Sequence, residues 1–134
     1  MRKSMAQQLL RRRGWCLSLT LIGLTWLLPG SSWSHAGLLK SIPARQAVLM
    51  HPPERVQLWF NERLEPQFSR LSVWNTHGVQ VDRGDVQVAG DDTRQLSVGL
   101  SSLPPGMYTV KYRVLSVDGH VVESQFPFTL QARP

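Results

Sequence analysis

The sequence predicts an all-β domain, an immunoglobulin-like Greek-key β-sandwich of about seven short strands. Three observations lead to this fold class. Apolar and polar residues alternate over several short runs, which is typical of strands with one buried face. Clusters of proline, glycine and aspartate separate these runs and mark turns. From His35 onward, no stretch of ten or more residues carries the apolar stripe of a helix.

The chain begins with a segment of different composition. Residues 1–14 contain five basic residues and no acid, and residues 15–29 are uncharged and mostly apolar. Fifteen helical residues rise roughly 22 Å, which is short of a bilayer core of about 30 Å. Small residues follow at Ser31, Ser32 and Ser34. We therefore expect residues 1–34 to be a secretory signal peptide and residues 35–134 the mature domain, with an uncleaved membrane anchor as the alternative.

The basic character of the chain belongs largely to this leader. All 134 residues carry a formal net charge of +6, but from His35 onward ten Lys and Arg face nine Asp and Glu, a net charge of +1. A nearly neutral domain lacks the broad basic face that nucleic acid requires, so we expect no nucleic-acid partner. The only cysteine, Cys16, also lies in the leader. The mature domain therefore has no disulfide or thiolate ligand and depends on its core.

The expected strands follow one another along the mature domain. Their apolar residues at alternate positions are expected to face the core. These residues are Val56, Leu58, Phe60, Leu71, Val73, Leu96, Val98, Leu100, Tyr108, Val110, Tyr112, Val114, Phe126, Phe128 and Leu130. Residues 103–108 resemble the entry to a late strand whose tyrosine forms a tyrosine corner, so Tyr108 is expected to be structural.

The candidate functional site centres on the motif Asp118-Gly119-His120, which follows the strand expected to end near Leu115. In extended backbone, residues i and i+2 point to the same side, so the carboxylate and the imidazole would project together. Cleavage after Ser34 would add the α-amine and imidazole of His35. Three nitrogens and one oxygen favour tetragonal Cu(II). Because an α-amine ordinarily has a pKa of about 7.7–8.0 and must lose its proton to bind, affinity should fall in acid.

Each part of this hypothesis has a simpler interpretation. An Asp-Gly pair is usually only a turn, and a histidine near a cleavage site can simply be solvated. Cleavage after Ala36 fits the small-x-small rule as well as cleavage after Ser34, and it would remove His35. The pattern does not choose between the two cleavage sites. The coincidence of both features in a cysteine-free exported domain favours the metal site.

Six stretches of the mature domain resemble a known family. They are residues 35–38 (HAGL), 41–44 (SIPA), 58–64 (LWFNERL), 66–69 (PQFS), 103–108 (LPPGMY) and 114–120 (VLSVDGH). Together they resemble the periplasmic copper resistance proteins of the CopC/PcoC/YobA family. The resemblance covers essentially all of residues 35–130. The last stretch, joined to an export leader that ends just before a histidine, is its most specific part.

The resemblance implies a cupredoxin-like β-barrel or sandwich, in agreement with the strand pattern. It also implies one Cu(II) per chain, held by the N-terminal histidine and by the aspartate and histidine of the late motif, which here are His35, Asp118 and His120. In some members a glutamate approaches the copper, and Glu62 occupies that position. Glu62 is therefore an additional candidate ligand, with a solvated acid as the alternative.

The family's role implies a periplasmic protein that buffers or delivers copper in copper homeostasis and resistance. An inner-membrane copper transport protein of the CopD type is the implied partner, and no membrane anchor remains after cleavage. Residues 74–81 contain no methionine, although some members bind Cu(I) through a methionine-rich loop at this place. Thioethers are the soft ligands that Cu(I) prefers, so we predict a protein that binds only Cu(II).

Two other functions remain as alternatives. A terminal histidine joined by a second histidine resembles the histidine brace of copper monooxygenases, which would make the protein an enzyme. Asp118 argues against this, because an anionic ligand stabilises Cu(II) and hinders cycling to Cu(I). The other alternative is a metal-free structural sandwich module that begins at Gly37. We predict that the protein is not an enzyme, and that His51 and His77 are ordinary solvent-facing loop residues.

Overall fold

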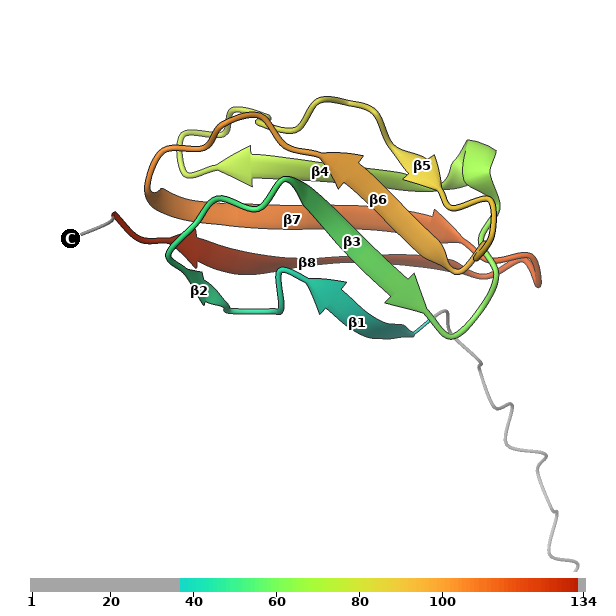
Figure 1. The fold of residues 1–134 in the computed structure, drawn as a ribbon. Coiled ribbons are helices and arrows are strands. Elements are labelled where there is room, and N and C mark those ends of the chain that lie inside the picture. Colours follow the sequence, from blue (N-terminus) through green and yellow to red (C-terminus); the bar gives the residue numbers. More distant parts are fainter. Residues whose placement is uncertain (1–36, 133–134) are drawn as a thin grey trace, which may run out of the picture. The chain divides into compact units, whose positions relative to one another are not determined.

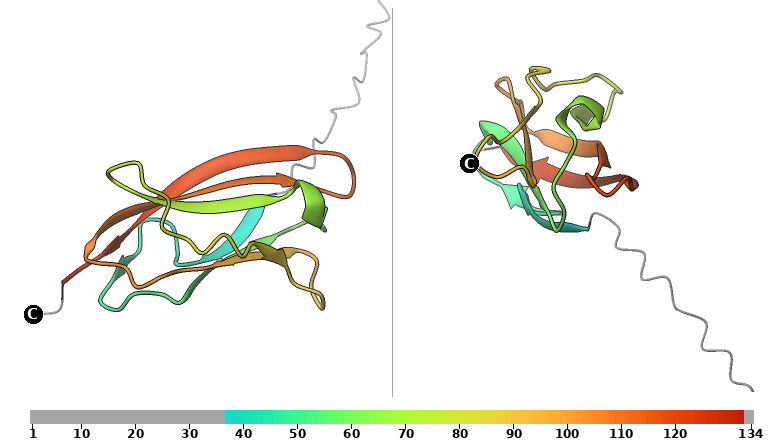
Figure 2. Two further views of the ribbon diagram at one scale, coloured as in Figure 1. Left: turned by 90° about the horizontal axis from the view of Figure 1, so that it is seen from above. Right: turned by 90° about the vertical axis from the view of Figure 1, so that its right-hand side faces the viewer.

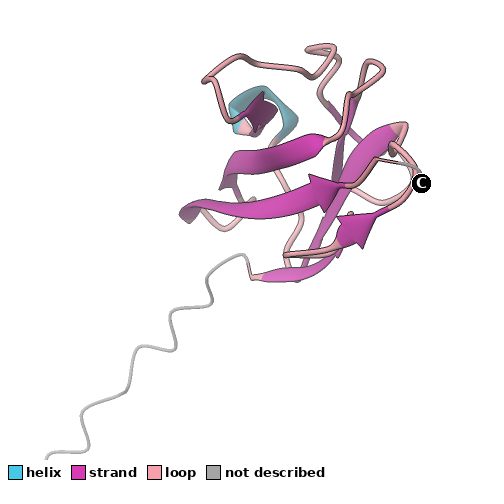
Figure 3. Cartoon of the chain, turned by 90° about the vertical axis from the view of Figure 1, so that its left-hand side faces the viewer, coloured by secondary structure: helices cyan, strands magenta, loops and turns pink. Residues whose placement is uncertain are grey.

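The computed structural model describes residues 37–132, which form two packed β-sheets (Figure 1). The strands of the first sheet, in spatial order, are β1 (Leu38–Ile42), β3 (Arg55–Phe60), β6 (Gln95–Gly99) and β5 (Gln87–Val88). Those of the second are β2 (Val48–Leu49), β8 (Val121–Leu130), β7 (Gly106–Leu115) and β4 (Arg70–Asn75). A short 3-10 turn, η1 (Pro66–Phe68), is the only helical segment among the described residues (Figure 3). The predicted all-β sandwich is confirmed.

Residues 37–132 form eight strands, where the sequence predicted about seven. The strands that alternation did not predict, β1, β2 and β5, lie at sheet edges, and β2 and β5 have only two residues each. No residue of β1 is fully buried, and the pairing with β3 shifts between Leu38 and Lys40. An edge strand with a bulge presents no regular apolar face, so its sequence carries no period-two pattern.

The core lies between the two sheets. Every residue that alternation assigned to the core is at most 4% exposed. Leu64 and Leu103, which come from loops, complete the buried cluster. The sheets meet through Phe60 of β3 and Tyr112 of β7, whose rings pack edge to face with centroids 5.5 Å apart. Burying each large apolar side chain contributes about 1.5–3 kcal/mol, so a fold without disulfides can be stable.

The predicted tyrosine corner is present at the start of β7. The Tyr108 side chain is 3% exposed, and its hydroxyl donates a hydrogen bond to the Pro104 carbonyl. This bond fixes the proline-rich loop that crosses from β6 in one sheet to β7 in the other. The prediction that Tyr108 is structural is confirmed.

Three segments distant in sequence meet at one end of the sandwich, which we call the β7–β8 end. They are the start of β1, residues 61–65 after β3, and the turn 116–120 between β7 and β8 (Figures 1 and 2). The predicted signal peptide, its cleavage site and His35 lie outside the described residues. Within residues 37–132, no helix is long and apolar enough to cross a bilayer.

Candidate metal centre

The hairpin of β7 and β8 positions Asp118 and His120. Its ten residue pairs keep one register from Gly106↔Leu130 to Leu115↔Val121. Two backbone hydrogen bonds close the turn. The Ser116 N–H donates to the His120 carbonyl at 2.9 Å, and the Gly119 N–H donates to the Ser116 carbonyl at 2.9 Å. Gly119 has a φ of +92°, a conformation that side-chain-bearing residues rarely adopt. The glycine therefore lets the chain reverse between the two polar residues.

Within this turn, Asp118 and His120 are in direct contact. The His120 Nδ1 lies 3.0 Å from the Asp118 Oδ2, and the two side chains are 43% and 38% exposed. From the sequence we expected them on one side of an extended strand. They instead meet because the chain turns at Gly119, so the expected juxtaposition is found but its expected cause is wrong.

Ser116 orients the carboxylate of Asp118 through a hydrogen bond. Its side chain is 1% exposed, and its hydroxyl donates a hydrogen bond to the Asp118 Oδ1. The same hydroxyl lies 3.1 Å from the His120 carbonyl oxygen. The hydrogen bond from Ser116, together with that from His120, lowers the pKa of the Asp118 carboxyl below its usual value. Asp118 is therefore a carboxylate at neutral pH, with Oδ1 toward the serine and Oδ2 toward the imidazole.

The contact between His120 and Asp118 places two donor atoms side by side. With its proton, the His120 Nδ1 can donate to the Asp118 Oδ2. Metal ligands bind in their deprotonated form, and without that proton the ring nitrogen and the carboxylate oxygen, 3.0 Å apart, can bind one ion together. Asp118 and His120 thus provide one imidazole nitrogen and one carboxylate at the surface.

The chain enters the fold at the same end of the sandwich. The backbone N–H of Gly37 donates to the Asn61 Oδ1 at 2.6 Å, and the Asn61 N–H donates to the Gly37 carbonyl at 3.0 Å. Two residues further on, the Val117 N–H donates to the Arg63 carbonyl at 2.9 Å. Residues 61–63 therefore join the start of β1 to the β7–β8 turn. Sequence patterns did not predict these roles of Asn61 and Ser116. Asn61 bonds to Gly37, which is 24 residues away, and Ser116 bonds to Asp118 within one turn, and neither contact produces a periodic pattern in the sequence.

Glu62 lies in this connecting loop and is half-buried. It lines a polar hollow of about 420 Å³ whose far side is formed by residues 91–94. Among residues 37–132, no three His, Cys, Asp or Glu side chains are arranged to hold a metal ion. Asp118 and His120 therefore provide two donors of a Cu(II) site, and a complete donor set needs others.

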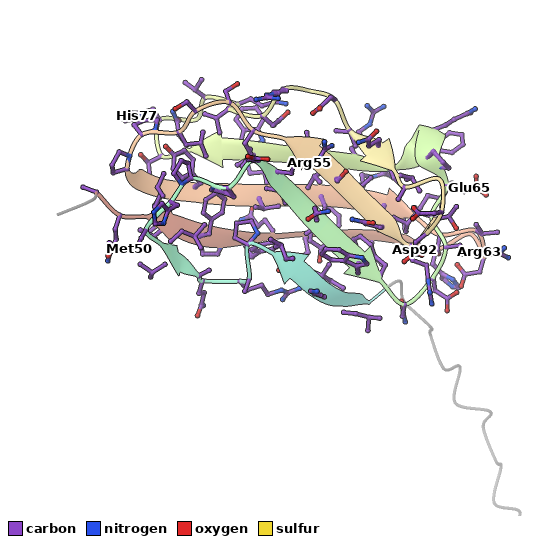
Figure 4. The ribbon with its side chains drawn as sticks, viewed as in Figure 1. Met50, Arg55, Arg63, Glu65, His77 and Asp92 are labelled. Atoms are coloured by element: carbon purple, nitrogen blue, oxygen red, sulfur yellow. The ribbon has the colours of Figure 1, made fainter. Side chains whose placement is uncertain are left out.

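The remaining predicted loop histidines are solvent-facing, as expected. His51 and His77 are both exposed. Figure 4 shows His77 and Met50 at one end of the sandwich and Arg63, Glu65 and Asp92 at the other, the β7–β8 end. His77 is therefore remote from the Asp118–His120 pair.

Comparisons with known proteins identify the family of the chain. A family model described as the CopC domain matches residues 38–131. The copper transport protein CutJ of Bacillus subtilis (strain 168) is 31% identical over 121 residues, which are 90% of this chain but 22% of CutJ. The chain thus spans about a fifth of that relative. Protein YobA of Escherichia coli (strain K12) is 33% identical over 108 residues, 80% of this chain and 87% of YobA.

A solved structure supports the same assignment. The crystal structure of CopC from Methylosinus trichosporium OB3b has a TM-score of 0.70 and 33% identity, and it covers 75% of this chain and 97% of that one. The family match covers more than half of the chain and nearly all of its described residues. The chain belongs to the CopC family of copper resistance and copper transport proteins, which bind copper and are not enzymes.

Proposed function

We propose that residues 35–134 form a periplasmic protein that binds one Cu(II) through His35, Asp118 and His120 and buffers or delivers it. The observation that carries this proposal is the Asp118–His120 contact at the end of the sandwich where Gly37 is anchored. His35 precedes Gly37 by two residues. Two residues span at most about 7 Å, so an N-terminal His35 would remain at the β7–β8 end.

The chemistry of these donors suits Cu(II). An N-terminal histidine supplies its α-amine and an imidazole nitrogen as a chelate, and His120 supplies a third nitrogen. The Asp118 carboxylate adds one negative charge, which favours the divalent ion. Nitrogen and oxygen donors in a tetragonal arrangement select Cu(II), which also heads the divalent affinity order.

The test is a Cu(II) titration of the processed protein with electron paramagnetic resonance (EPR) spectra. His120→Ala and Asp118→Ala each remove a donor, so we expect Cu(II) affinity to fall by at least tenfold and the spectrum to change. His77→Ala is the matched control, because it removes an exposed histidine at the far end of the sandwich. Wild-type binding in both site variants would contradict the proposed ligand set.

Glu62 is proposed as an additional ligand and is tested separately. It lies between Asn61, which anchors Gly37, and Arg63, which pairs with the β7–β8 turn. Glu62→Gln keeps the shape of the side chain and removes its charge. A changed EPR spectrum would assign Glu62 to the copper, and an unchanged one would leave three ligating residues.

The proposal also includes the metal selectivity and the partner of the protein. We propose that the protein does not bind Cu(I) tightly, because residues 74–81 contain no methionine. Stoichiometric Cu(I) uptake against a competing chelator would contradict this. An inner-membrane CopD-type transport protein is the proposed partner, and export by the signal peptide of residues 1–34 would bring the two into one compartment.

A further inference from the structure

A second surface feature lies on the outer face of the β2-β8-β7-β4 sheet, away from the core. Strands β4, β7 and β8 run side by side there (Figure 1). Side chains on this face line an open hollow of about 490 Å³. Its lining includes the outward residues Arg70, Ser72 and Trp74 of β4, Lys111 and Arg113 of β7, and Glu123 of β8. We call this feature the Trp74 groove. None of these residues belongs to the proposed copper site.

The Trp74 groove concentrates positive charge. Three cations and one carboxylate are among its lining residues, whereas the whole mature domain has a net charge of only +1. Arg70 lies directly opposite Arg113 in the register of β4 and β7. Like charges directly opposite each other destabilise a sheet. Glu123 offsets this only weakly, because its Oε2 is 3.8 Å from the Arg113 Nε and both side chains are at least half exposed.

An aromatic side chain stands beside these cations. The Trp74 indole N–H donates to the Ser72 hydroxyl at 2.9 Å, which restrains the ring on the sheet. The Lys111 Nζ lies 5.3 Å from the ring centroid, within the range of a cation–π interaction. Restrained tryptophan and arginine side chains are enriched among the residues that dominate protein interfaces. The groove therefore offers both an apolar contact and unbalanced positive charge.

We propose that the Trp74 groove binds an extended acidic segment of a partner polypeptide. The spacing of the groove residues supports this occupant. The groove residues lie in three successive rows of paired residues across β4 and β7, two residues apart along each strand. The first row contains Arg70 and Arg113, the second Lys111 and the third Trp74. Rows two residues apart are separated by about 6.6 Å, which is also the spacing of same-side residues in an extended peptide. Carboxylates at positions i and i+2 would thus meet the two cationic rows, and an apolar residue at i+4 would meet Trp74.

The Trp74 groove lies close to the proposed copper site, so a partner bound there would be near the metal. Arg113 precedes Ser116 of the metal-site turn by three residues, or about 10 Å of strand. A partner seated in the groove therefore lies beside the β7–β8 end without occupying it. The groove is separate from the copper ligands, so its binding of a partner stands or falls independently of the proposed copper site.

The experiment measures binding of a fluorescein-labelled blocked peptide, Asp-Thr-Glu-Thr-Leu, to the processed protein by anisotropy. The Trp74 indole N–H resonance is followed by NMR. We expect saturable binding that weakens as salt rises, a shift of the Trp74 resonance, and at least fivefold weaker binding by Arg70→Gln and by Lys111→Gln. Arg83→Gln is the matched control, because it removes one exposed cation outside the groove.

Several outcomes would overturn the inference. They are absence of binding, equal binding of the neutral peptide Asn-Thr-Gln-Thr-Leu, equal weakening by Arg83→Gln, and retention on phosphatidylglycerol vesicles without peptide binding. A folding defect is separated by the melting temperature. Since Arg70→Gln relieves the cross-strand repulsion with Arg113, its melting temperature should equal or exceed that of the wild type at low salt. A lower value would show that Arg70 supports the fold instead.

Discussion

Ser116 is the residue on which the geometry of the candidate site depends most. It is 1% exposed, yet its hydroxyl bonds to a surface carboxylate and lies close to the His120 carbonyl. The hydrogen bond from this buried hydroxyl to Oδ1 restrains the Asp118 carboxylate in its orientation. The same burial denies Ser116 a role as a hydrolytic nucleophile, although serine, aspartate and histidine stand close together.

Ser116→Ala is predicted to weaken Cu(II) binding roughly tenfold, because residues that orient metal ligands commonly contribute 10–100-fold to affinity. The measurement is a competitive Cu(II) titration together with the EPR spectrum, which responds to the position of Asp118. Ser97→Ala is the control, since Ser97 is a buried serine of β6 whose hydroxyl accepts a hydrogen bond from Arg55 at 3.3 Å. Equal effects of the two substitutions would contradict a positioning role for Ser116.

The conformation of the β7–β8 turn depends on the backbone of Gly119. Its φ is +92°, and no atom lies within 4 Å of the place where a Cβ would be added. Gly119→Ala should therefore cost stability through backbone strain alone, about 1–2 kcal/mol, and loosen the Asp118–His120 contact. Gly90→Ala is the matched control, because Gly90 is equally open but lacks a positive φ. Chemical denaturation of both variants tests this, and equal stabilities would show that Gly119 is not required.

The tyrosine corner predicts a specific response to alkaline pH. Burial raises the pKa of Tyr108, because the phenolate would be desolvated. The folded state therefore keeps its proton longer than the unfolded chain, so this contribution to stability is complete below about pH 10 and is lost as the pH rises further.

Tyr108→Phe should cost about 1 kcal/mol at neutral pH, through loss of the bond to Pro104, and should reduce the alkaline loss. Urea denaturation from pH 8 to 11 measures both effects. Parallel stability curves for the wild type and the variant would rule out Tyr108 as the source of the alkaline loss.

At the scale of the strands, the sequence was informative wherever buried and more exposed residues alternate. Leu58 of β3 and Val110 of β7 are fully buried as alternation predicted. Alternation cannot be recognised in β2 and β5, because they have two residues each. The Asp118–His120 juxtaposition was predicted from spacing, but the turn that produces it depends on the backbone conformation of Gly119, which spacing alone does not specify.

At the scale of the described domain, the fold brings segments that are distant in sequence together at the β7–β8 end. The Gly37–Asn61 hydrogen bonds and the Arg63–Val117 bond connect the chain entry to the β7–β8 turn. The Gly37–Asn61 bonds extend the pairing of β1 with β3, and the Arg63–Val117 bond joins the loop after β3 to a turn of the other sheet, so no local motif predicts them. The Trp74 groove also arises only in the folded protein, because β4, β7 and β8 bring Arg70, Lys111 and Trp74 onto one face.

The central claim is that His35, once freed by cleavage, completes a Cu(II) site with Asp118 and His120. It is tested most directly by comparing two forms of the protein, one beginning at His35 and one with a single glycine added before it. Intact mass verifies each terminus, and copper content after dialysis with EPR reports the site. We expect one tightly held Cu(II) with a three-nitrogen spectrum in the first form and much weaker binding in the second. Equal copper content and identical spectra in the two forms, or an exported protein that begins at Gly37, would contradict the claim.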